Sequence, residues 1–355
     1  MTSYLKPVEN LINMPINMTN NHNYLGYWIR RFLMEYLILD KNYSVNTQKS
    51  YRDTFRLLLP FIANRLHKTV DNILVDDVDS SLILSFLNTI ENERKCSIST
   101  RNQRLAAVAS LARYIGCHCP EYVIWCQSVR NIPIKRSPKN LITYLEKDEI
   151  DALLAAPDMN TSLGRRDHAL LLFLYNSGAR VEEAATLQVQ DLTIPRKGTT
   201  GFGIAQIKGK GGKTRRCPLW SITCKKLQEL TKGKSSSDYV FSNRLNNPLT
   251  RFGVYEIVRK YAIAISAEHP QVLNKRLTPH TIRHTTATHL LQSGVDINTI
   301  RAWLGHVSLN TTNIYAEVNL AMKAKALEQC IIPDAGRKHQ KWRDNKDLMT
   351  FLDSL

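Results

Sequence analysis

Hydrophobic positions recur at helical spacing through the first third of the chain. In the segment NTQKSYRDTFRLLLPFIANRL, apolar side chains return every three or four residues, at Tyr51, Phe55, Leu58, Leu59 and Ile62. Ser44 or Asn46 can begin this helix, because either side chain can accept a hydrogen bond from a backbone N–H group of the first turn. The segments DDVDSSLILSFLNTIENER and STRNQRLAAVASLARYIG predict two further amphipathic helices. We therefore predict a helical domain over residues 24–127.

Two segments without this periodicity flank the predicted domain. Residues 1–23 are rich in Asn and are typical of a loose N-terminal arm. Residues 128–144 contain two prolines and four basic side chains, which predicts a basic linker between domains.

Helical patterning resumes after the linker and predicts a second domain over residues 145–330. A strong helical pattern runs through GRRDHALLLFLYNSGARVEEAATL and is broken at Asn176-Ser177-Gly178. The tract GTTGFGIAQIKGKGGKTRRCPL has β-branched residues around a Gly-rich turn, which predicts a hairpin or a three-stranded sheet. The predicted fold is mainly α with a small antiparallel β-sheet, followed by a C-terminal tail over residues 331–355.

The net charge of the chain indicates which classes of partner it can bind. Its 355 residues contain 48 Lys and Arg against 31 Asp and Glu, a formal net charge of +17. Such a charge favours a polyanion, because side chains that neutralise phosphates release counterions. A protein of the ribosome or of a membrane surface would also fit, so charge alone does not identify the partner.

Cysteine usage and the absence of long apolar runs indicate a protein of the cytoplasm. The seven cysteines are scattered, which is typical of reduced thiols. Cys117, His118, Cys119 and Cys126 could suggest zinc, but the usual paired ligand arms are missing, so a small buried-thiol cluster is favoured. No signal peptide is recognisable, and the most apolar stretch, residues 169–175, is far too short to span a bilayer.

Two cationic side chains lie at turns of the second domain. Arg180 follows a Gly turn and opens a helix, where its guanidinium can hold a phosphate through a bidentate fork. Lys210 lies between two glycines at the expected hairpin tip, where a bare backbone leaves its ammonium room to reach a neighbouring site. The rival phosphate-binding pattern G-x-x-x-x-G-K-[ST] does not occur there in register. Taken singly, an Arg at a helix start is usually just solvated, and glycines at a hairpin are more often turn chemistry than function.

A third group of candidates lies in LTPHTIRHTTATHLLQSG. Thr278 can cap the helix and Pro279 suits its first position. His280 and Arg283 are three residues apart, so they share a helix face and can address one phosphate. His280 and His284 could instead hold a metal, but no acidic third ligand is evident and the H-E-x-x-H pattern is absent. We therefore favour phosphate over metal.

The last motif is IRAWLGHVSLNTTNIYAEV. A helix is expected to end at Gly305, His306 follows directly, and Tyr315 lies nine residues further on. A lone Tyr at such a place is most often core or surface filler.

Four more basic side chains are candidates for DNA contacts or for a solvated face, namely Arg101, Arg104, Lys213 and Arg215.

Together these motifs resemble the tyrosine recombinases of the phage-integrase/Xer family. The matches occur in the family's order: Arg180 with Glu183, Leu187 and Asp191, then the GKGGKTRRCPL hairpin, His280 with Arg283, His306, and Tyr315. The spacings between the last three motifs match as well. The resemblance is close over residues 141–318. It is looser over residues 24–126, which resemble the family's helical, SAM-like core-binding domain.

The resemblance implies a catalytic role for each matching residue. Tyr315 would attack a backbone phosphate and form a 3′-phosphotyrosine link. Arg180 and Arg283 would clamp its non-bridging oxygens, while His280 and His306 would hydrogen-bond the same phosphate or assist proton transfer. Lys210 would act as general acid on the departing 5′ oxygen. The link conserves the phosphodiester energy, so no nucleotide cofactor and no metal ion is expected.

The resemblance also implies partners and leaves several biological roles open. Four protomers would act on two specific sites in double-stranded DNA of a bacterial nucleoid, with the tail of residues 331–355 docking on its own domain or on a neighbouring protomer. The arm and the long tail favour an integrase of a mobile element over Xer-type dimer resolution. A type IB-like topoisomerase and a non-catalytic DNA-binding regulator are less favoured candidates. The DNA target cannot be read from the sequence.

Overall fold

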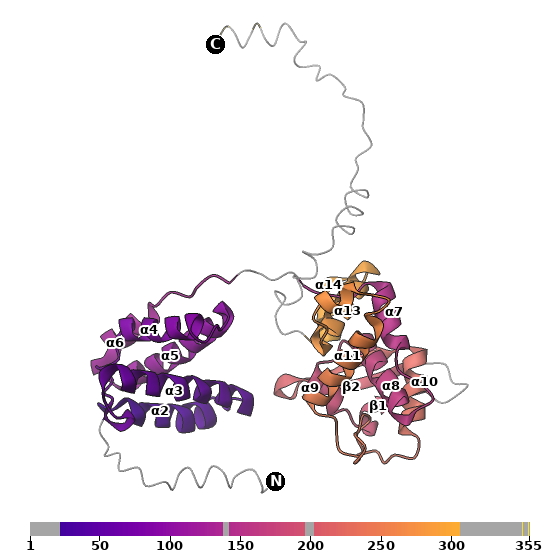
Figure 1. Ribbon diagram of the computed structural model, residues 1–355, viewed down its shortest axis with the longest axis horizontal. Coiled ribbons are helices and arrows are strands. Elements are labelled where there is room, and N and C mark those ends of the chain that lie inside the picture. Colours follow the sequence, from indigo (N-terminus) through magenta and orange to yellow (C-terminus); the bar gives the residue numbers. More distant parts are fainter. Residues whose placement is uncertain (1–21, 138–141, 196–201, 306–349, 351–353, 355) are drawn as a thin grey trace. The chain divides into compact units, whose positions relative to one another are not determined.

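The computed structural model describes residues 22–137, 142–195 and 202–305, together with residues 350 and 354, and of Lys210 only the backbone. The chain forms two compact units, Met1–Lys139 and Asn140–Leu355 (Figure 1). His306, Tyr315 and the predicted tail contacts lie outside the described residues.

The N-terminal unit is helical throughout its described part. Its helices are α2 (Leu25–Arg31), the π-helix η1 (Phe32–Asp40), α3 (Val45–Leu66), α4 (Ser80–Asn92), α5 (Ile98–His118) and α6 (Val123–Arg130), with short 3₁₀ turns at Val70–Asn72 and Pro120–Tyr122. Ser44 caps α3 by accepting a bond from the backbone N–H of Thr47 at 3.4 Å, which confirms one of the two predicted caps. The predicted apolar face of α3 lies in the core, where Phe55, Leu58 and Ile62 are buried.

The core of this unit continues into the segment that predicted a linker. Helix α6 runs to Arg130, and Val129 and Ile132 are buried among the other core residues. Val129 and Ile132 therefore belong to the N-terminal core, and the predicted start of the linker at residue 128 was wrong. The prolines and charges of the segment predicted a linker, although Val129 and Ile132, three residues apart, are core positions.

The C-terminal unit combines helices with one small sheet. Its helices are α7 (Lys147–Ala155), α8 (Ser162–Ser177), α9 (Val181–Ala185), α10 (Ser221–Thr231), α11 (Arg251–Ile265), α12 (Gln271–Asn274), α13 (Pro279–Gln292) and α14 (Ile297–Leu304), with 3₁₀ turns at Val189–Asp191 and Lys210–Gly212. The strands β1 (Leu192–Thr193), β2 (Gly203–Lys208) and β3 (Thr214–Leu219) form an antiparallel sheet in that order. The predicted fold class, mainly helical with a small antiparallel sheet, is confirmed.

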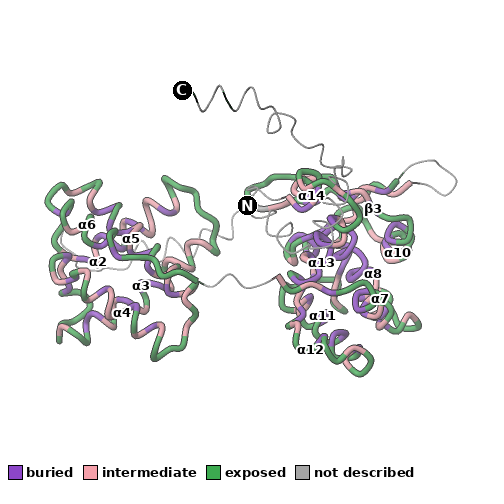
Figure 2. The backbone as a smooth tube through the Cα atoms, turned by 90° about the horizontal axis from the view of Figure 1, so that it is seen from above, coloured by how far each residue is buried: buried purple, intermediate pink, exposed green. Residues whose placement is uncertain are grey.

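Helix α8 lies at the centre of the C-terminal unit. Every residue from Ala169 to Ser177 is buried, and both α10 and α13 pack against the helix (Figure 2). The helix ends at Gly178, whose φ of 58° is left-handed and suits glycine. Because α8 is enclosed, the turn that follows it has a well-defined place inside the unit.

The remaining predictions about the described residues concern metals and membranes. No group of three His, Cys, Asp or Glu in the described ranges could hold a metal ion, and Cys117 is exposed whereas Cys126 is buried. The predicted buried-thiol cluster was therefore wrong for Cys117, whereas Cys126 is buried as expected. Among the helices that the structure describes, none is long and apolar enough to cross a membrane.

Candidate functional site

The site begins at the turn between α8 and α9. Arg180 is the N-cap residue of α9, two residues after the left-handed Gly178, so its side chain leaves the buried end of α8 toward the surface. A Cβ atom on Gly178 would lie 2.5 Å from Cδ2 of Leu304, so α14 also packs directly on this turn. The side chain of Arg180 is 42% exposed, which leaves its guanidinium accessible to a ligand.

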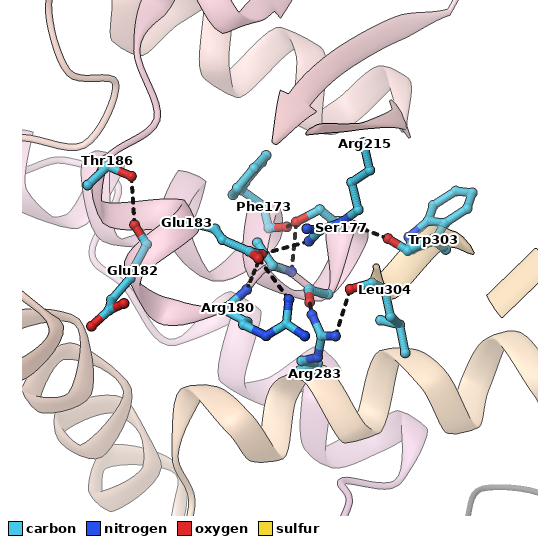
Figure 3. A network of polar contacts seen from close by, with 12 residues as sticks. Phe173, Ser177, Arg180, Glu182, Glu183, Thr186, Arg215, Arg283, Trp303 and Leu304 are labelled. Atoms are coloured by element: carbon cyan, nitrogen blue, oxygen red, sulfur yellow. Dashed lines mark hydrogen bonds and ion pairs between the residues drawn. The ribbon is translucent and has the colours of Figure 1, made fainter. Parts of the chain in front are cut away.

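Glu183 orients Arg180 and joins it to the sheet. Its carboxylate accepts a bond from the backbone N–H of Arg180 at 2.8 Å and another from Nη1 of Arg180 at 2.9 Å. It also accepts from Nη2 of Arg215, on β3, at 2.7 Å (Figure 3). The carboxylate therefore serves as an N-terminal cap for α9 and as the counter-ion of two arginines.

The ionisation of Glu183 depends on these arginines. Burial alone would raise the pKa of this carboxyl, but the hydrogen bonds and charges of Arg215 and Arg180 outweigh it and lower the pKa below its ordinary value of 4.5. Because the folded pKa is depressed, the stabilisation is present above about pH 4.5 and is lost as the pH falls through the folded pKa.

We expect Glu183→Ala to destabilise the C-terminal unit by about 3–5 kcal/mol, because Arg215 would remain as a buried charge without its counter-ion. Urea-induced unfolding at pH 7 measures this loss. The matched control is Glu182→Ala, since the neighbouring Glu182 is exposed and its replacement should change stability by no more than about 0.5 kcal/mol. Equal losses in the two variants would contradict the assigned role of Glu183.

Arg283 is the second arginine of the site and lies on α13. The helix begins as predicted, with Thr278 accepting a bond from the backbone N–H of Thr281 and Pro279 at the first position. Arg283 is 2% exposed. Its Nη1 donates to the carbonyl oxygen of Gly178 at 2.5 Å and its Nη2 to that of Leu304 at 2.7 Å. The guanidinium thus joins α13 to the turn that carries Arg180 and to the end of α14.

The end of α14 is held by side chains from other elements. The carbonyl oxygen of Trp303 accepts a bond from Nε of Arg215 at 2.9 Å. The indole Nε1 of Trp303 donates to the backbone carbonyl of Asn176 at 3.2 Å. The helix then stops at the left-handed Gly305, with φ of 66°. These contacts hold the end of α14, and His306 is the next residue in the sequence after Gly305.

Two histidines of α13 lie beside the arginines. The ring centroids of His280 and His284 are 4.2 Å apart in an edge-on arrangement. Desolvation, followed by the charges of Arg283 and Arg180, lowers the pKa of His280. Desolvation, His280 and Arg283 lower the pKa of His284 to about 4. Both imidazoles are therefore mainly neutral at pH 7, and a neutral ring can either donate or accept a hydrogen bond.

The depressed pKa of His284 predicts a pH dependence of stability. An unfolded His titrates near 6.5 and the folded His284 near 4, so its contribution is complete above about pH 6.5 and is lost as the pH falls toward 4. We expect this group to account for about 3 kcal/mol over that window. Urea unfolding of the wild type and of His284→Gln at pH 7 and pH 4 measures it. If the two proteins lose the same stability, the folded pKa of His284 is not depressed.

The structure brings together Arg180, His280 and Arg283 from the predicted set. Lys210 lies at the turn between β2 and β3, where Gly211 and Gly212 have positive φ angles, as the Gly-rich pattern predicted. Lys213 is exposed on the same turn, so a DNA contact by Lys213 stays a prediction.

Three predicted DNA contacts fall on arginines that bind other parts of the protein. Arg101 is 2% exposed and its Nη1 donates to the carbonyl of Pro133 at 3.3 Å, so the prediction that it contacts DNA was wrong. The side chain of Arg215 is 11% exposed and hydrogen-bonded to Glu183 and to the carbonyl of Trp303, so little of it is open to DNA and its contact with DNA stays a prediction. Arg104 is partly buried and donates to Thr54 at 2.9 Å, so its contact with DNA stays a prediction.

Asn176 contributes to the site although no motif singled it out. It is 1% exposed, its Oδ1 accepts from the backbone N–H of Trp220 at 2.8 Å, and its Nδ2 donates to the carbonyl of Pro218 at 3.2 Å. The available signal was a polar residue directly after a long apolar helical run, at the point where the helix pattern breaks. Such a residue, once buried, needs partners.

Comparison with known proteins shows that this protein is a tyrosine recombinase, an enzyme of DNA recombination. Residues 143–322 match the phage integrase family, and residues 29–115 match the N-terminal SAM-like domain of phage integrases. The chain belongs to the phage integrase family.

Two relatives align over most of the chain. The protein y4rC of Sinorhizobium fredii, whose name describes it as an integrase/recombinase, is 39% identical over 336 residues, or 94% of this chain and 99% of its own. Tyrosine recombinase XerC of Pelotomaculum thermopropionicum is 32% identical over 301 residues, or 82% and 93%.

Solved structures share the fold. The integrase of transposon Tn1549, in complex with a circular intermediate DNA, has a TM-score of 0.65 at 15% identity and covers 85% of this chain and 99% of that one. XerH recombinase bound to a palindromic difH substrate has a TM-score of 0.62 at 21% identity and covers 81% of each chain.

Proposed function

We propose that this recombinase cleaves and rejoins DNA through Tyr315, with Arg180, Lys210, His280, Arg283 and His306 as its catalytic residues. The observation that supports the proposal is the hydrogen bond from Arg283 to the carbonyl of Gly178, two residues before Arg180, together with His280, which lies one helical turn before Arg283 on α13. Two guanidinium groups and an imidazole at one place suit a phosphate that gains negative charge in the transition state.

Each residue has a distinct part in the reaction. The phenolate oxygen of Tyr315 attacks phosphorus, the bond to the 5′ oxygen breaks, and a 3′-phosphotyrosine link forms. Lys210 donates a proton to the departing 5′ oxygen, and His306 and the neutral His280 hydrogen-bond the phosphate or assist the tyrosine proton. The reverse attack by a 5′ hydroxyl rejoins a strand. Because the phosphodiester energy is kept in the link, the reaction needs no nucleotide.

The partners we propose are two specific sites in double-stranded DNA, bound by four protomers inside the bacterial cell. Support comes from the net charge of +17 and from the DNA named with XerH and with the Tn1549 integrase. For the biological role we favour integration, excision or transposition of a mobile element, because y4rC aligns over nearly all of both chains. Xer-type dimer resolution is the second candidate role, supported by the similarity to XerC.

A suicide substrate tests the proposed chemistry. Nicked duplexes that carry a recombination site, obtained from the junctions of a recombined substrate, are incubated with the protein in excess EDTA. We expect a covalent protein–DNA adduct that peptide mass spectrometry places on Tyr315. Loss of the adduct in EDTA would refute the metal-free reaction, and an adduct on another residue would refute the assignment of the nucleophile. An adduct that forms without site preference would favour a topoisomerase. The absence of any adduct would favour a DNA-binding regulator.

A further inference from the structure

Arg215 lies inside the site and has little surface open to DNA. It projects from β3, its side chain is 11% exposed, and its Nη2 donates to Glu183 at 2.7 Å. Its Nε donates to the carbonyl oxygen of Trp303 at 2.9 Å (Figure 3). One planar guanidinium thus connects the carboxylate that orients Arg180 with the last turn of α14. A planar fork can hold both partners in fixed directions, which a lysine ammonium cannot.

The end of α14 needs donors from outside the helix. The last four carbonyl groups of a helix have no partner within it. Here Arg215 donates to the carbonyl of Trp303 and Arg283 to that of Leu304. Positive groups at this end also interact favourably with the helix dipole. Both bonds therefore locate the end of α14 relative to the arginines of the site.

The backbone packs closely on Arg215 at the next residue. A Cβ atom on Gly305 would lie 3.1 Å from Cδ and 3.3 Å from Nη1 of Arg215. Gly305 also has the left-handed φ that favours glycine. The side chain of Arg215 therefore packs closely on the backbone of Gly305, and a shift of Arg215 would displace the end of α14.

We propose that Arg215 is a positioning residue that couples Arg180, through Glu183, to the end of α14, which directly precedes His306 in the sequence. This inference rests on the proposed function, in which Arg180 and His306 act on the scissile phosphate. Arg215 does not bind DNA. It keeps two parts of the site in register with each other.

The test compares Arg215→Ala and Arg215→Lys with the matched control Arg216→Ala. Arg216 is the next residue of β3 and is exposed on the other face of the strand. Three quantities are measured: the single-turnover rate of adduct formation at saturating suicide substrate, the Kd for the same DNA over a range of salt, and hydrogen exchange of residues 300–305 without DNA. Arg215→Lys retains the charge and serves if the alanine variant does not fold.

If Arg215 is a positioning residue, both Arg215 variants lower the rate on the order of 100-fold, the cost of a misplaced group, whereas Kd stays within about twofold. The backbone amides of residues 300–305 then exchange faster than in the wild type in both Arg215 variants, and their exchange is unchanged in Arg216→Ala. Unchanged exchange would overturn the inference. A second result would also overturn it: weaker DNA binding with a normal rate at saturating substrate. If the slope of log K against log salt then falls by about 1, Arg215 contacts a phosphate.

Failure of the proposed function gives a different result. A wild-type protein without an adduct on Tyr315 refutes the proposed chemistry and, with it, the catalytic purpose of the coupling. The hydrogen-exchange comparison needs neither DNA nor activity. It still shows whether Arg215 holds the end of α14.

Discussion

Arg283→Ala is expected to lower the rate of DNA cleavage on the order of 10³-fold and to destabilise the C-terminal unit by about 3–5 kcal/mol. The first effect follows from the proposed role of Arg283 as a preorganised charge at the phosphate. The second follows from burial, because Arg283 is 2% exposed and its removal leaves a cavity beneath the carbonyls of Gly178 and Leu304. Single-turnover cleavage of a suicide substrate and urea unfolding measure the two losses separately.

Arg283→Lys separates charge from geometry. A lysine keeps the positive charge but cannot donate to two carbonyls along the fixed directions of a guanidinium, so we expect it to recover part of the stability and little of the rate. Arg259→Ala is the matched surface control, since Arg259 is 59% exposed and pairs with Glu256 on one helix. If Arg283→Ala were as stable as Arg259→Ala and cleaved DNA at the normal rate, both proposed roles of Arg283 would be contradicted.

Periodicity and end signals were sufficient to predict most of the helical fold. The spacing of Phe55, Leu58 and Ile62 indicated the buried face of α3, and Ser44 and Thr278 cap their helices as predicted. The glycines at positions 211 and 212 predicted the turn between β2 and β3. These features depend on neighbouring residues alone, so a single sequence contains the information.

The π-helix over Phe32–Asp40 could not be predicted in the same way. Its sequence, FLMEYLILD, is apolar at most positions and has no clear face, so periodicity does not distinguish an α-helix from a wider one. The structure packs Phe32 against Tyr36, Tyr51, Phe55 and Tyr114, with ring centroids 5.3–6.0 Å apart. Three of these four aromatic partners come from other helices, and tertiary contacts of this kind are not visible in a local pattern.

The motifs indicated which residues form the site but not how deeply each side chain is buried. The sequence motifs correctly pointed to Arg180, His280 and Arg283 as neighbours. A basic residue in a basic chain, however, looks the same whether it faces DNA or an internal carboxylate. Arg101 and Arg215 were therefore assigned to DNA, although one contacts the carbonyl of Pro133 and the other Glu183. Their partners lie 32 residues away in each case, which no local spacing indicates.

Tyr315→Phe is expected to abolish adduct formation, lowering the rate by at least on the order of 10⁴-fold, because the variant lacks the attacking oxygen. Removal of one hydroxyl leaves the charges that bind DNA unchanged, so we expect Kd and its salt dependence to stay the same. The rate is measured with the suicide substrate and Kd by titration of the same DNA. A residual adduct on another residue would show that Tyr315 is not the nucleophile.

Tyr175→Phe provides the matched control, because it removes the same hydroxyl from a tyrosine with a structural role. Oη of Tyr175 lies 2.8 Å from Nδ1 of His289, and burial raises the pKa of this phenol to about 12, which disfavours the phenolate that attack requires. We expect Tyr175→Phe to lose about 1 kcal/mol of stability and to keep the adduct. Tyr315→Phe should show the opposite pair of results. If Tyr175→Phe abolished the adduct as well, loss of a hydroxyl could no longer be assigned to nucleophilic attack, and the assignment to Tyr315 would rest on peptide mapping alone.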